Sequence, residues 1–354
     1  MLRTLRDLIV VAGFIRPKVL IDGLQHQQSP LSAGKLLPLA LISLSGLLVE
    51  PLAYLQQIWY GRKLKQVVLP SNPVIVIGHW RSGTTYLHTL LGADPQFATA
   101  RNSLICAPQV ALLLKPIIET LLKHFITCYR PIDNVSWNAT SPQEDEVGLA
   151  RLTADTNMLG VTLPQDYREN FKRTVLRWTN DYEKQLNYFS RLTWLHSGPG
   201  KSTLLIKNPA HTARIPLLLK LFPSARFILL KRQRQDSVGS LVLVKQRLHA
   251  LVSLQQAPNQ CHLAEESLQC HAALLHAFER DRHLLGEKQL VEVDYDQLIK
   301  DPFGTIGSIY NQLEIPHTEI SQHTIKAKIE ELSSYKRHQT LALNPTAAEL
   351  IQKD

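Results

Sequence analysis

A short run of branched apolar residues leads directly into a glycine-bounded loop, and this junction restricts the possible folds more than any other part of the chain. Residues 74–77 read VIVI, residues 78–85 read GHWRSGTT, and a helical pattern follows over residues 86–91. Unbroken β-branched residues suit a strand buried on both faces of a parallel sheet, and glycines permit a tight turn. The loop amides, the helix dipole and Arg81 would then all point at one negative group. The sequence therefore predicts a strand, an anion-binding loop and a helix.

The position of the cation in this loop indicates which anion it binds. The loop reads G-x-x-x-x-G-T-T, so Thr84 stands where a nucleoside triphosphate P-loop carries its lysine, and the cation is Arg81 instead. A P-loop lysine reaches the β and γ phosphates in magnesium-dependent phosphoryl transfer, and its absence counts against that chemistry. We expect Arg81, Ser82, Gly83, Thr84 and Thr85 to hold a phosphate without metal. A βα turn with no ligand is the alternative.

A second segment has the same strand-to-helix form and carries two further phosphate-binding candidates. The apolar run at residues 226–230 ends close to Arg232, and a helical pattern covers residues 237–256. Ser240 lies eight residues after Arg232, in the first turns of that helix, and Asp236 is placed to cap it. A forked guanidinium and a hydroxyl in this arrangement can close on one phosphate. A basic, solvated loop is the alternative interpretation.

Both arrangements resemble the nucleotide site of sulfotransferases that use 3'-phosphoadenosine-5'-phosphosulfate (PAPS), namely the 5'-phosphosulfate loop and the 3'-phosphate site. Three more segments resemble the bacterial-type sulfotransferase family in the same order, SPQEDE at 141–146, KNPAHT at 207–212 and VDYDQLIKDP at 293–302. The resemblance covers about residues 70–340. It implies a P-loop-like fold, PAPS as sulfuryl donor, no metal, and an acceptor with a hydroxyl or amine group. Near its end, Tyr335 and Lys336 are expected to contact the phosphoadenosine.

Catalytic roles follow from the resemblance and from the needs of sulfuryl transfer. Lys207 is the choice for stabilising the departing phosphate, and Arg81 would share that work. A base must also accept the proton of the acceptor. Residues two apart on a helix face different sides, so only one of Glu144 and Glu146 is expected to face the pocket. Glu144 is favoured for this role, and Glu146 and His211 remain alternatives.

The remaining pattern alternates strands with helices and predicts an α/β protein. The expected strands are residues 74–77, 203–207, 226–230 and 290–294, and the expected helices include 86–91, 109–127, 177–196, 212–222, 237–256, 265–286 and 303–313. This alternation favours a three-layer, P-loop-like fold with a central, mainly parallel sheet flanked by helices. Ligands of such sheets bind at the carboxyl ends of the strands, where Arg81, Lys207 and Arg232 all fall. We assign residues 71–354 to this domain.

The net charge and the cysteine content limit which binding partners and which cellular compartment are expected. The net charge of +9 suits a polyanionic cofactor or an anionic membrane surface. No zinc-finger spacing or RNA-recognition motif is present, so nucleic acid is not expected as a partner. Four scattered cysteines without CxxC pairing fit a reducing compartment, and the expected location is cytoplasmic, with peripheral membrane contact as one option.

The first 70 residues form a separate, helical appendage by pattern. Residues 36–60 are leucine-rich but are interrupted by Pro38, Gly46, Glu50 and Pro51, so a transmembrane helix is disfavoured. A helical hairpin that covers the substrate pocket, docking to a membrane surface and a true span are the open alternatives. The acceptor is a small molecule, a lipid or a glycan, and no oligomeric state is indicated. Rival functions are a P-loop kinase-like phosphotransferase and a non-catalytic anion- or glycan-binding protein.

Overall fold

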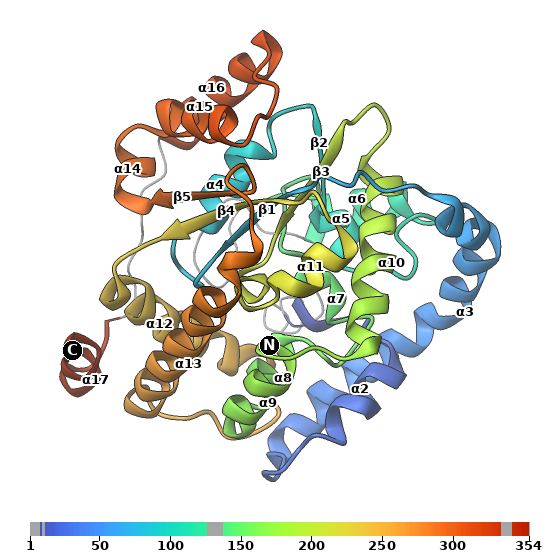
Figure 1. Ribbon diagram of the computed structural model, residues 1–354. Helices are drawn as coiled ribbons and strands as arrows, with labels where there is room; N and C mark the ends of the chain where they lie inside the picture. The colour runs from blue at the N-terminus through green and yellow to red at the C-terminus, as the bar shows by residue number, and fades with distance from the viewer. Residues whose placement is uncertain (1–7, 9–10, 126–136, 334–341, 354) are drawn as a thin grey trace.

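Five parallel strands form one sheet at the centre of the molecule (Figure 1). The computed structural model describes residues 8, 11–125, 137–333 and 342–353. The strand order is β2–β3–β1–β4–β5. The strands are β1 (Val74–Gly78), β2 (Phe97–Thr99), β3 (Thr203–Lys207), β4 (Arg226–Lys231) and β5 (Leu290–Asp294). The first strand therefore lies in the middle, between β3 and β4, which is the position from which a loop can meet residues of both neighbours.

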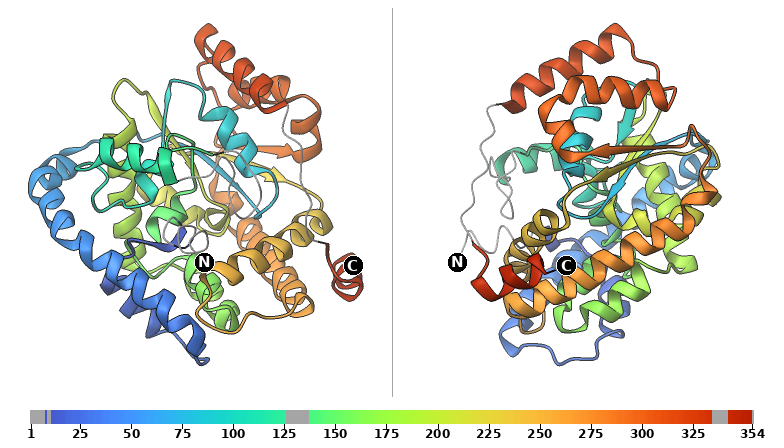
Figure 2. Two further views of the ribbon diagram at one scale, coloured as in Figure 1. Left: turned by 180° about the vertical axis from the view of Figure 1, so that it is seen from behind. Right: turned by 60° about the vertical axis from the view of Figure 1, so that its left-hand side comes forward.

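Alternate residues of the central strand point to two different cores. Ile75 and Ile77 pack on one face of the sheet, whereas Val74 and Val76 pack on the other. Helices α10 (Asn180–Ser197) and α11 (Ile215–Leu221) cover the first face, and helices α4 (Thr84–Leu91), α15 (Pro302–Gln312) and α16 (Glu319–Ser333) cover the second (Figure 1, Figure 2). All four residues are fully buried, as their unbroken apolar sequence predicted. The predicted three-layer α/β fold with a parallel sheet is confirmed.

The other helices complete the domain around this sheet. Helix α13 (Gln260–Asp281) packs against α12 (Arg234–Val252) and α17 (Pro345–Gln352) beyond the sheet (Figure 1). The remaining elements are α5 (Asn102–Ile105), α6 (Lys115–Phe125), α7 (Asp145–Leu149), α8 (Asn157–Thr162), α9 (Tyr167–Thr174) and α14 (Tyr295–Lys300), with short 3-10 turns η1 (Ala33–Lys35), η2 (Pro164–Asp166), η3 (Pro209–Ala213) and η4 (Arg282–Leu284).

Two local predictions differ from the structure. The strand β2 was not predicted, because its three residues follow a proline and are too few to show a pattern. The helix expected over residues 109–127 begins only at Lys115. The preceding residues form turns whose amides at Leu112 and Leu113 donate to the buried side chain of Gln56, at 2.8 and 3.2 Å. A contact with a residue more than fifty positions earlier thus replaces helix hydrogen bonds.

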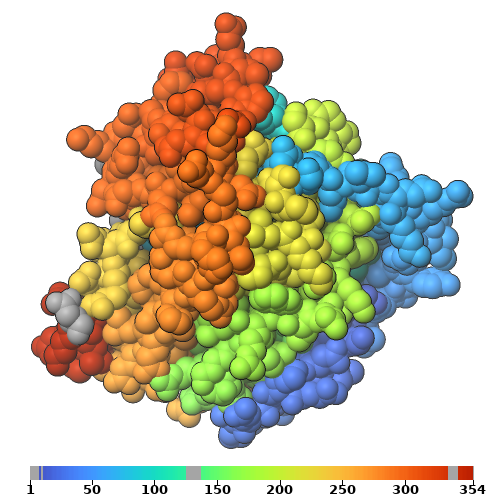
Figure 3. Space-filling model, in the orientation of Figure 1, coloured from blue at the N-terminus to red at the C-terminus, as the bar shows by residue number. Residues whose placement is uncertain are grey.

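The N-terminal appendage contains two helices, α2 (Pro17–Leu24) and α3 (Leu36–Gln66), and α3 is one continuous helix of 31 residues. The hairpin over residues 36–60, one of the three alternatives left open by the sequence, is therefore excluded. Pro51 lies inside α3 and removes only one backbone hydrogen bond, which a helix of this length tolerates when it is packed on a domain. The helix runs along one edge of the molecule (Figure 1, Figure 3).

Each of the other residues that seemed to interrupt this helix has a place in the packing. Pro38 lies in the first turn, where a backbone donor would have no partner. Gly46 lies against the carbonyl of Ile15, and a Cβ there would come within 2.0 Å of that oxygen. Glu50 accepts two hydrogen bonds from Arg16, at 2.8 and 2.9 Å. The apparent breaks are thus contacts with the segment that precedes α2.

Candidate active site

The loop after β1 is held in a shape that glycine makes possible. Gly78 and Gly83 have φ angles of 136° and 96°, in the left-handed region, and Arg81 also has a positive φ of 69°. A Cβ on Gly78 would lie 2.5 Å from the carbonyl oxygen of Leu230, and one on Gly83 would lie 2.5 Å from the ring of Tyr295. Side chains at either glycine would therefore push the loop away from β4 and from the start of α14.

The loop delivers its last residues to the N-terminus of a helix. Ser82 is buried and donates from its hydroxyl to the carbonyl of His79, at 2.7 Å. Gly83 occupies the position before α4, with no side-chain cap, so Thr84 and Thr85 are the first residues of the helix. The amides of a first helical turn lack partners within the helix and favour an anion. The predicted strand, loop and helix are all present.

The two sequence motifs meet in space. The Nε of Arg81 donates to the hydroxyl of Ser240, at 3.1 Å, and Arg232 donates to the carbonyl of Arg81, at 3.0 Å. The guanidinium of Arg232 lies over the ring of Tyr295, 4.4 Å from its centre. Its Nε is buried and has no hydrogen-bond partner among the described residues. Arg232 is thus held by the Tyr295 ring, the carbonyl of Arg81 and Asp236, whose carboxylate lies 3.4 Å from its guanidinium and does not cap α12 as predicted.

A buried ion pair stands beside this loop, at the end of the neighbouring strand. Lys207 is the last residue of β3 and lies opposite Val76 of β1. Its Nζ is 2.8 Å from an Oε of Glu144, and the two side chains are 3% and 13% exposed. Burial, which disfavours the charged form, raises the pKa of Glu144 above its ordinary value, and the Lys207 ammonium only partly opposes this. A carboxyl with a raised pKa beside a cation is a plausible proton acceptor at neutral pH.

Glu146, two residues later, occupies a sealed position. Its carboxylate is fully buried and accepts hydrogen bonds from Arg214 at 3.1 Å, Asn208 at 2.7 Å, Tyr182 at 3.1 Å and the amide of Asn157 at 2.7 Å. Burial alone would raise the pKa of Glu146, but the charge and hydrogen bonds of Arg214, with the other donors, lower it on balance. The Glu146 carboxylate therefore joins α7 to the segments that supply its four donors. It has no exposed surface, so no oxygen lone pair faces a substrate.

His211 is likewise enclosed. Its Nε2 lies 3.1 Å from an Oδ of Asp145, and its side chain is fully buried. The predicted contacts of Tyr335 and Lys336 fall outside the residues that the structure describes.

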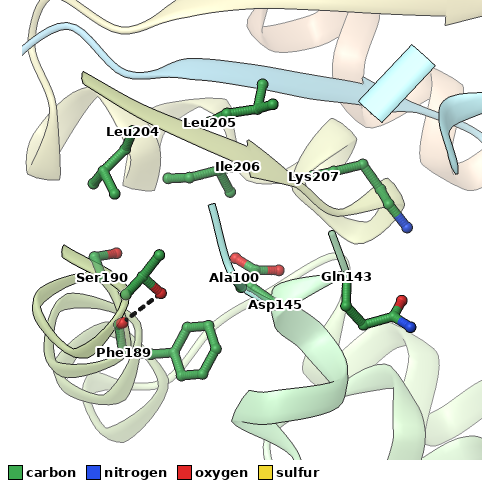
Figure 4. Close-up of a pocket in the computed structure, with 10 residues that line it drawn as sticks. Ala100, Gln143, Asp145, Phe189, Ser190, Leu204, Leu205, Ile206 and Lys207 are labelled. Atoms are coloured by element: carbon green, nitrogen blue, oxygen red, sulfur yellow. Dashed lines mark hydrogen bonds between the residues drawn. The ribbon is translucent and has the colours of Figure 1, made fainter. Parts of the chain in front are cut away.

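A small cavity lies directly behind Lys207 (Figure 4). Its volume of about 10 Å³ holds no more than one water molecule, so it is a gap in the packing and not a substrate pocket. In Figure 4 the Lys207 ammonium extends beyond the end of β3, while the apolar side chains of the strand line the cavity. The lining residues are Ala100, Gln143, Asp145, Phe189, Ser190, Thr193, Leu204, Leu205, Ile206 and Lys207.

Sequence reasoning missed several residues that hold this site in place. Arg214 and Tyr182 enclose Glu146, Tyr295 supports Arg232, and the hydroxyl of Thr212 accepts a 2.8 Å hydrogen bond from the amide of Gly78. The acidic run at residues 144–146 could have indicated that such partners exist, because three buried carboxylates require several hydrogen-bond donors. The sequence does not show which tyrosines and arginines supply them.

The fold defines a P-loop-like α/β transferase in which the loop after β1 has Thr84 at the usual lysine position and its cation at Arg81. Residues 73–319 match the sulfotransferase family over well more than half of the chain, so the chain belongs to this family. It is an enzyme that transfers a sulfuryl group.

Relatives with known activity or structure agree with this assignment. The omega-hydroxy-beta-dihydromenaquinone-9 sulfotransferases Stf3 of Mycobacterium bovis and Mycobacterium tuberculosis are each 27% identical over 300 residues, which cover 79% of this chain and 72% of theirs. The crystal structure of STF9 from Mycobacterium avium superimposes with a TM-score of 0.66 at 18% identity, covering 84% of this chain and 76% of that one. STF1 from M. tuberculosis gives 0.65 at 19% identity, with 90% of both chains covered. At these identities the two structures support the fold.

Proposed function

We propose that this enzyme transfers the sulfuryl group of PAPS to a hydroxyl or amine of an apolar acceptor, by in-line displacement and without a metal ion. The observation that carries the proposal is the meeting of three strand ends. The Arg81 loop after β1 contacts Ser240 and Arg232 from the β4 side, and the Lys207–Glu144 pair lies at the end of β3.

The residues present fit the proposed donor. Helix α4 and the amides of Thr84 and Thr85 suit a 5'-phosphosulfate. The guanidinium of Arg232, held over Tyr295 and next to the Arg81 loop, suits a 3'-phosphate, with Ser240 as a second donor. These contacts supply cationic and amide groups of the kind that a sulfuryl donor needs, and they are the reason for expecting no metal.

The Lys207–Glu144 pair can serve both ends of the reaction. When bound, PAPS supplies a sulfur that forms a bond to the acceptor oxygen or nitrogen as its bond to the 5'-phosphate oxygen breaks. Lys207 and Arg81 stabilise the negative charge that develops on that phosphate oxygen. Glu144 accepts the proton lost by the acceptor, and its raised pKa suits this role better than the sealed Glu146 or the buried His211.

The acceptor that we propose is a hydroxylated lipid. Stf3, by its name, acts on an omega-hydroxy menaquinone derivative. The organisation proposed is a helical appendage of residues 1–70 on a catalytic domain of residues 71–354, in the cytoplasm and in peripheral contact with a membrane.

Binding of 3'-phosphoadenosine-5'-phosphate, followed by turnover with radiolabelled PAPS and a panel of lipid and phenolic acceptors, tests the proposal. We expect metal-independent binding and labelled product from lipid alcohols. Magnesium-dependent binding of ATP would support the kinase alternative. Nucleotide binding without turnover on the whole panel would support the non-catalytic alternative.

Replacement of Arg232 tests the assignment of the 3'-phosphate site. Arg232→Ala should weaken binding of 3'-phosphoadenosine-5'-phosphate by about 10–100-fold, because a charged hydrogen bond contributes roughly 1.5–3 kcal/mol. Binding of the analogue without the 3'-phosphate should hardly change. Arg234→Ala is the matched control, since Arg234 donates to the carbonyl of Lys353 and lies away from the loop contact. Equal losses for both nucleotides would remove Arg232 from the site.

A further inference from the structure

One side of α3 exposes large apolar side chains over most of its length. The side chains of Leu37, Leu48, Tyr54 and Trp59 are 69%, 69%, 70% and 67% exposed. With about 3.6 residues per turn, the exposed positions fall on one continuous side of the helix, about 35 Å long. They are Leu36, Leu37, Ala40, Leu44, Leu47, Leu48, Pro51, Tyr54, Leu55, Ile58 and Trp59, and we call this set the α3 face. None of its members is charged.

This face is far more apolar than the surface of a soluble domain usually is. Exposed leucines normally occur singly, and a contiguous apolar patch of this length marks a binding surface. The stretch Ala33–Gln66 is long and apolar enough to cross a membrane, yet only 17% of its most apolar window is buried. The core of the domain therefore does not explain these side chains.

The opposite side of the same helix is fixed to the domain by polar contacts. Gln56 is fully buried and donates to the carbonyl of Pro108, at 3.1 Å, while its oxygen accepts the amide of Leu112. Glu50, the one acidic residue of α3, points away from the α3 face and is paired with Arg16. A helix held in this way along its length can lie on a bilayer but cannot pass through one without breaking these bonds.

The end of the α3 face has the composition of a membrane interface. Tyr54 and Trp59 have amphipathic rings of the kind enriched where hydrocarbon meets lipid headgroups. The next turns bring Arg62 and Lys65, both exposed, to the same side of the helix as the α3 face. Each cation near an anionic membrane surface contributes about 1 kcal/mol of attraction. The net charge of +9 acts in the same direction.

We propose that α3 docks this enzyme onto an anionic lipid bilayer, with the helix lying in the plane of the interface and the α3 face among the lipid chains. The purpose of this docking rests on the proposed function, because an enzyme on the membrane could reach a hydroxylated lipid acceptor there. Docking itself depends only on the α3 face and on Arg62 and Lys65.

Flotation of the full chain with vesicles tests the docking. We expect the protein to float with vesicles of phosphatidylcholine mixed with phosphatidylglycerol, and less with phosphatidylcholine alone. Leu48→Glu should lower partitioning about tenfold or more, because it places a charge where the exposed Leu48 would enter the lipid chains. Gln57→Glu is the matched control, since it places the same charge on an exposed position of α3 outside the α3 face.

Two further measurements separate the alternatives. A double variant, Arg62→Ser with Lys65→Ser, should lose most of the preference for the anionic vesicles and most of its salt dependence. Binding of 3'-phosphoadenosine-5'-phosphate in solution is expected to be unchanged in every α3 variant. Nucleotide binding without flotation would overturn the docking alone, and flotation without nucleotide binding would overturn only the proposed function.

Other results would also overturn the inference. Equal losses in Leu48→Glu and Gln57→Glu would show that the α3 face is not the contact. Retention on membranes in alkaline carbonate would indicate a true span. A dimer in lipid-free solution that Leu48→Glu dissociates would assign the face to a second copy of the chain.

Discussion

Glu144 and Glu146 lie two residues apart at the start of one helix, each is paired with a cation, and yet they have opposite environments. Glu144 keeps 13% of its side chain exposed and has Lys207 as its charged partner. Glu146 is sealed and receives four donors, including Arg214. The pKa of Glu144 is raised and that of Glu146 is lowered. Burial acts on both carboxylates, so the number of donors decides the direction.

This difference separates a group that can exchange a proton from one that holds the fold. A carboxylate that is satisfied by four donors resists protonation and contributes stability, whereas one with a single cationic partner retains basicity. The position of each partner agrees with this division. Lys207 is the last residue of β3, next to β1, while Arg214 is the fully buried residue that precedes α11.

Glu144→Gln should produce the largest effect, on catalysis. Loss of a positioned base lowers kcat/KM by about 10²–10⁴-fold. The free energy of unfolding should also fall, because the buried ammonium of Lys207 loses its charged partner, so kinetics are compared below the melting temperature of the variant. Steady-state kinetics with PAPS and the best acceptor, together with thermal unfolding, measure both. Full activity in this variant would transfer the role of the base to another group.

Glu146→Ala should act on stability. Removing one partner of a buried pair leaves Arg214 uncompensated and costs about 3–5 kcal/mol of unfolding free energy. Urea unfolding at neutral pH measures the loss. Because a destabilised variant also loses activity, Glu146→Gln serves as the milder control. A Glu146→Gln enzyme with normal stability but abolished turnover would show that Glu146, and not Glu144, is the base.

The pH dependence of stability should have opposite signs for the two carboxyls. Glu144 has a raised pKa, so its contribution is present below the ordinary glutamate pKa and is lost as pH rises through its own value. Glu146 has a lowered pKa, so its contribution is present above the ordinary value and is lost as pH falls. The stability difference between wild type and Glu144→Gln should therefore fall with rising pH, and that for Glu146→Gln should rise. Parallel slopes would contradict the assigned environments.

The pH profile of kcat/KM should also reflect the raised pKa of Glu144. If Glu144 is the base, kcat/KM rises with pH along an acid limb that lies above the ordinary glutamate range, and this limb is absent in Glu144→Gln.

Sequence reasoning predicted the sheet and the strand–loop–helix geometry at residues 74–91 better than it predicted this pair of environments. The strands β1, β3, β4 and β5 were predicted within one residue, because buried parallel strands are short apolar runs with clear ends. The acidic run at residues 144–146 was recognised, but its partners were not. Arg214 and Tyr182 come from other segments, and only the packing of α10 and η3 against α7 brings them to Glu146.

For the N-terminal helix α3, sequence reasoning underestimated the length of continuous helix. Pro38, Gly46, Glu50 and Pro51 were interpreted as interruptions of an apolar stretch. In the folded chain Glu50 is paired with Arg16, and Gly46 lies against the backbone of Ile15. Such contacts are not visible in a local pattern.

Tyr182→Phe is the smallest change that still distinguishes the two carboxyls. The Tyr182 hydroxyl donates to Glu146 at 3.1 Å and makes no contact with Glu144. Its removal should cost about 1–3 kcal/mol of unfolding free energy, since the hydrogen bond donated to Glu146 and the one accepted from Arg214 are both lost. The pH profile of kcat/KM should not move. Tyr310→Phe is the matched control, because the Tyr310 hydroxyl also donates to a buried carboxylate, that of Asp94, at 2.7 Å. Similar stability losses with unchanged profiles in both variants would confirm that the sealed pair is structural. A shifted profile in Tyr182→Phe alone would show that the network around Glu146 sets the basicity of Glu144.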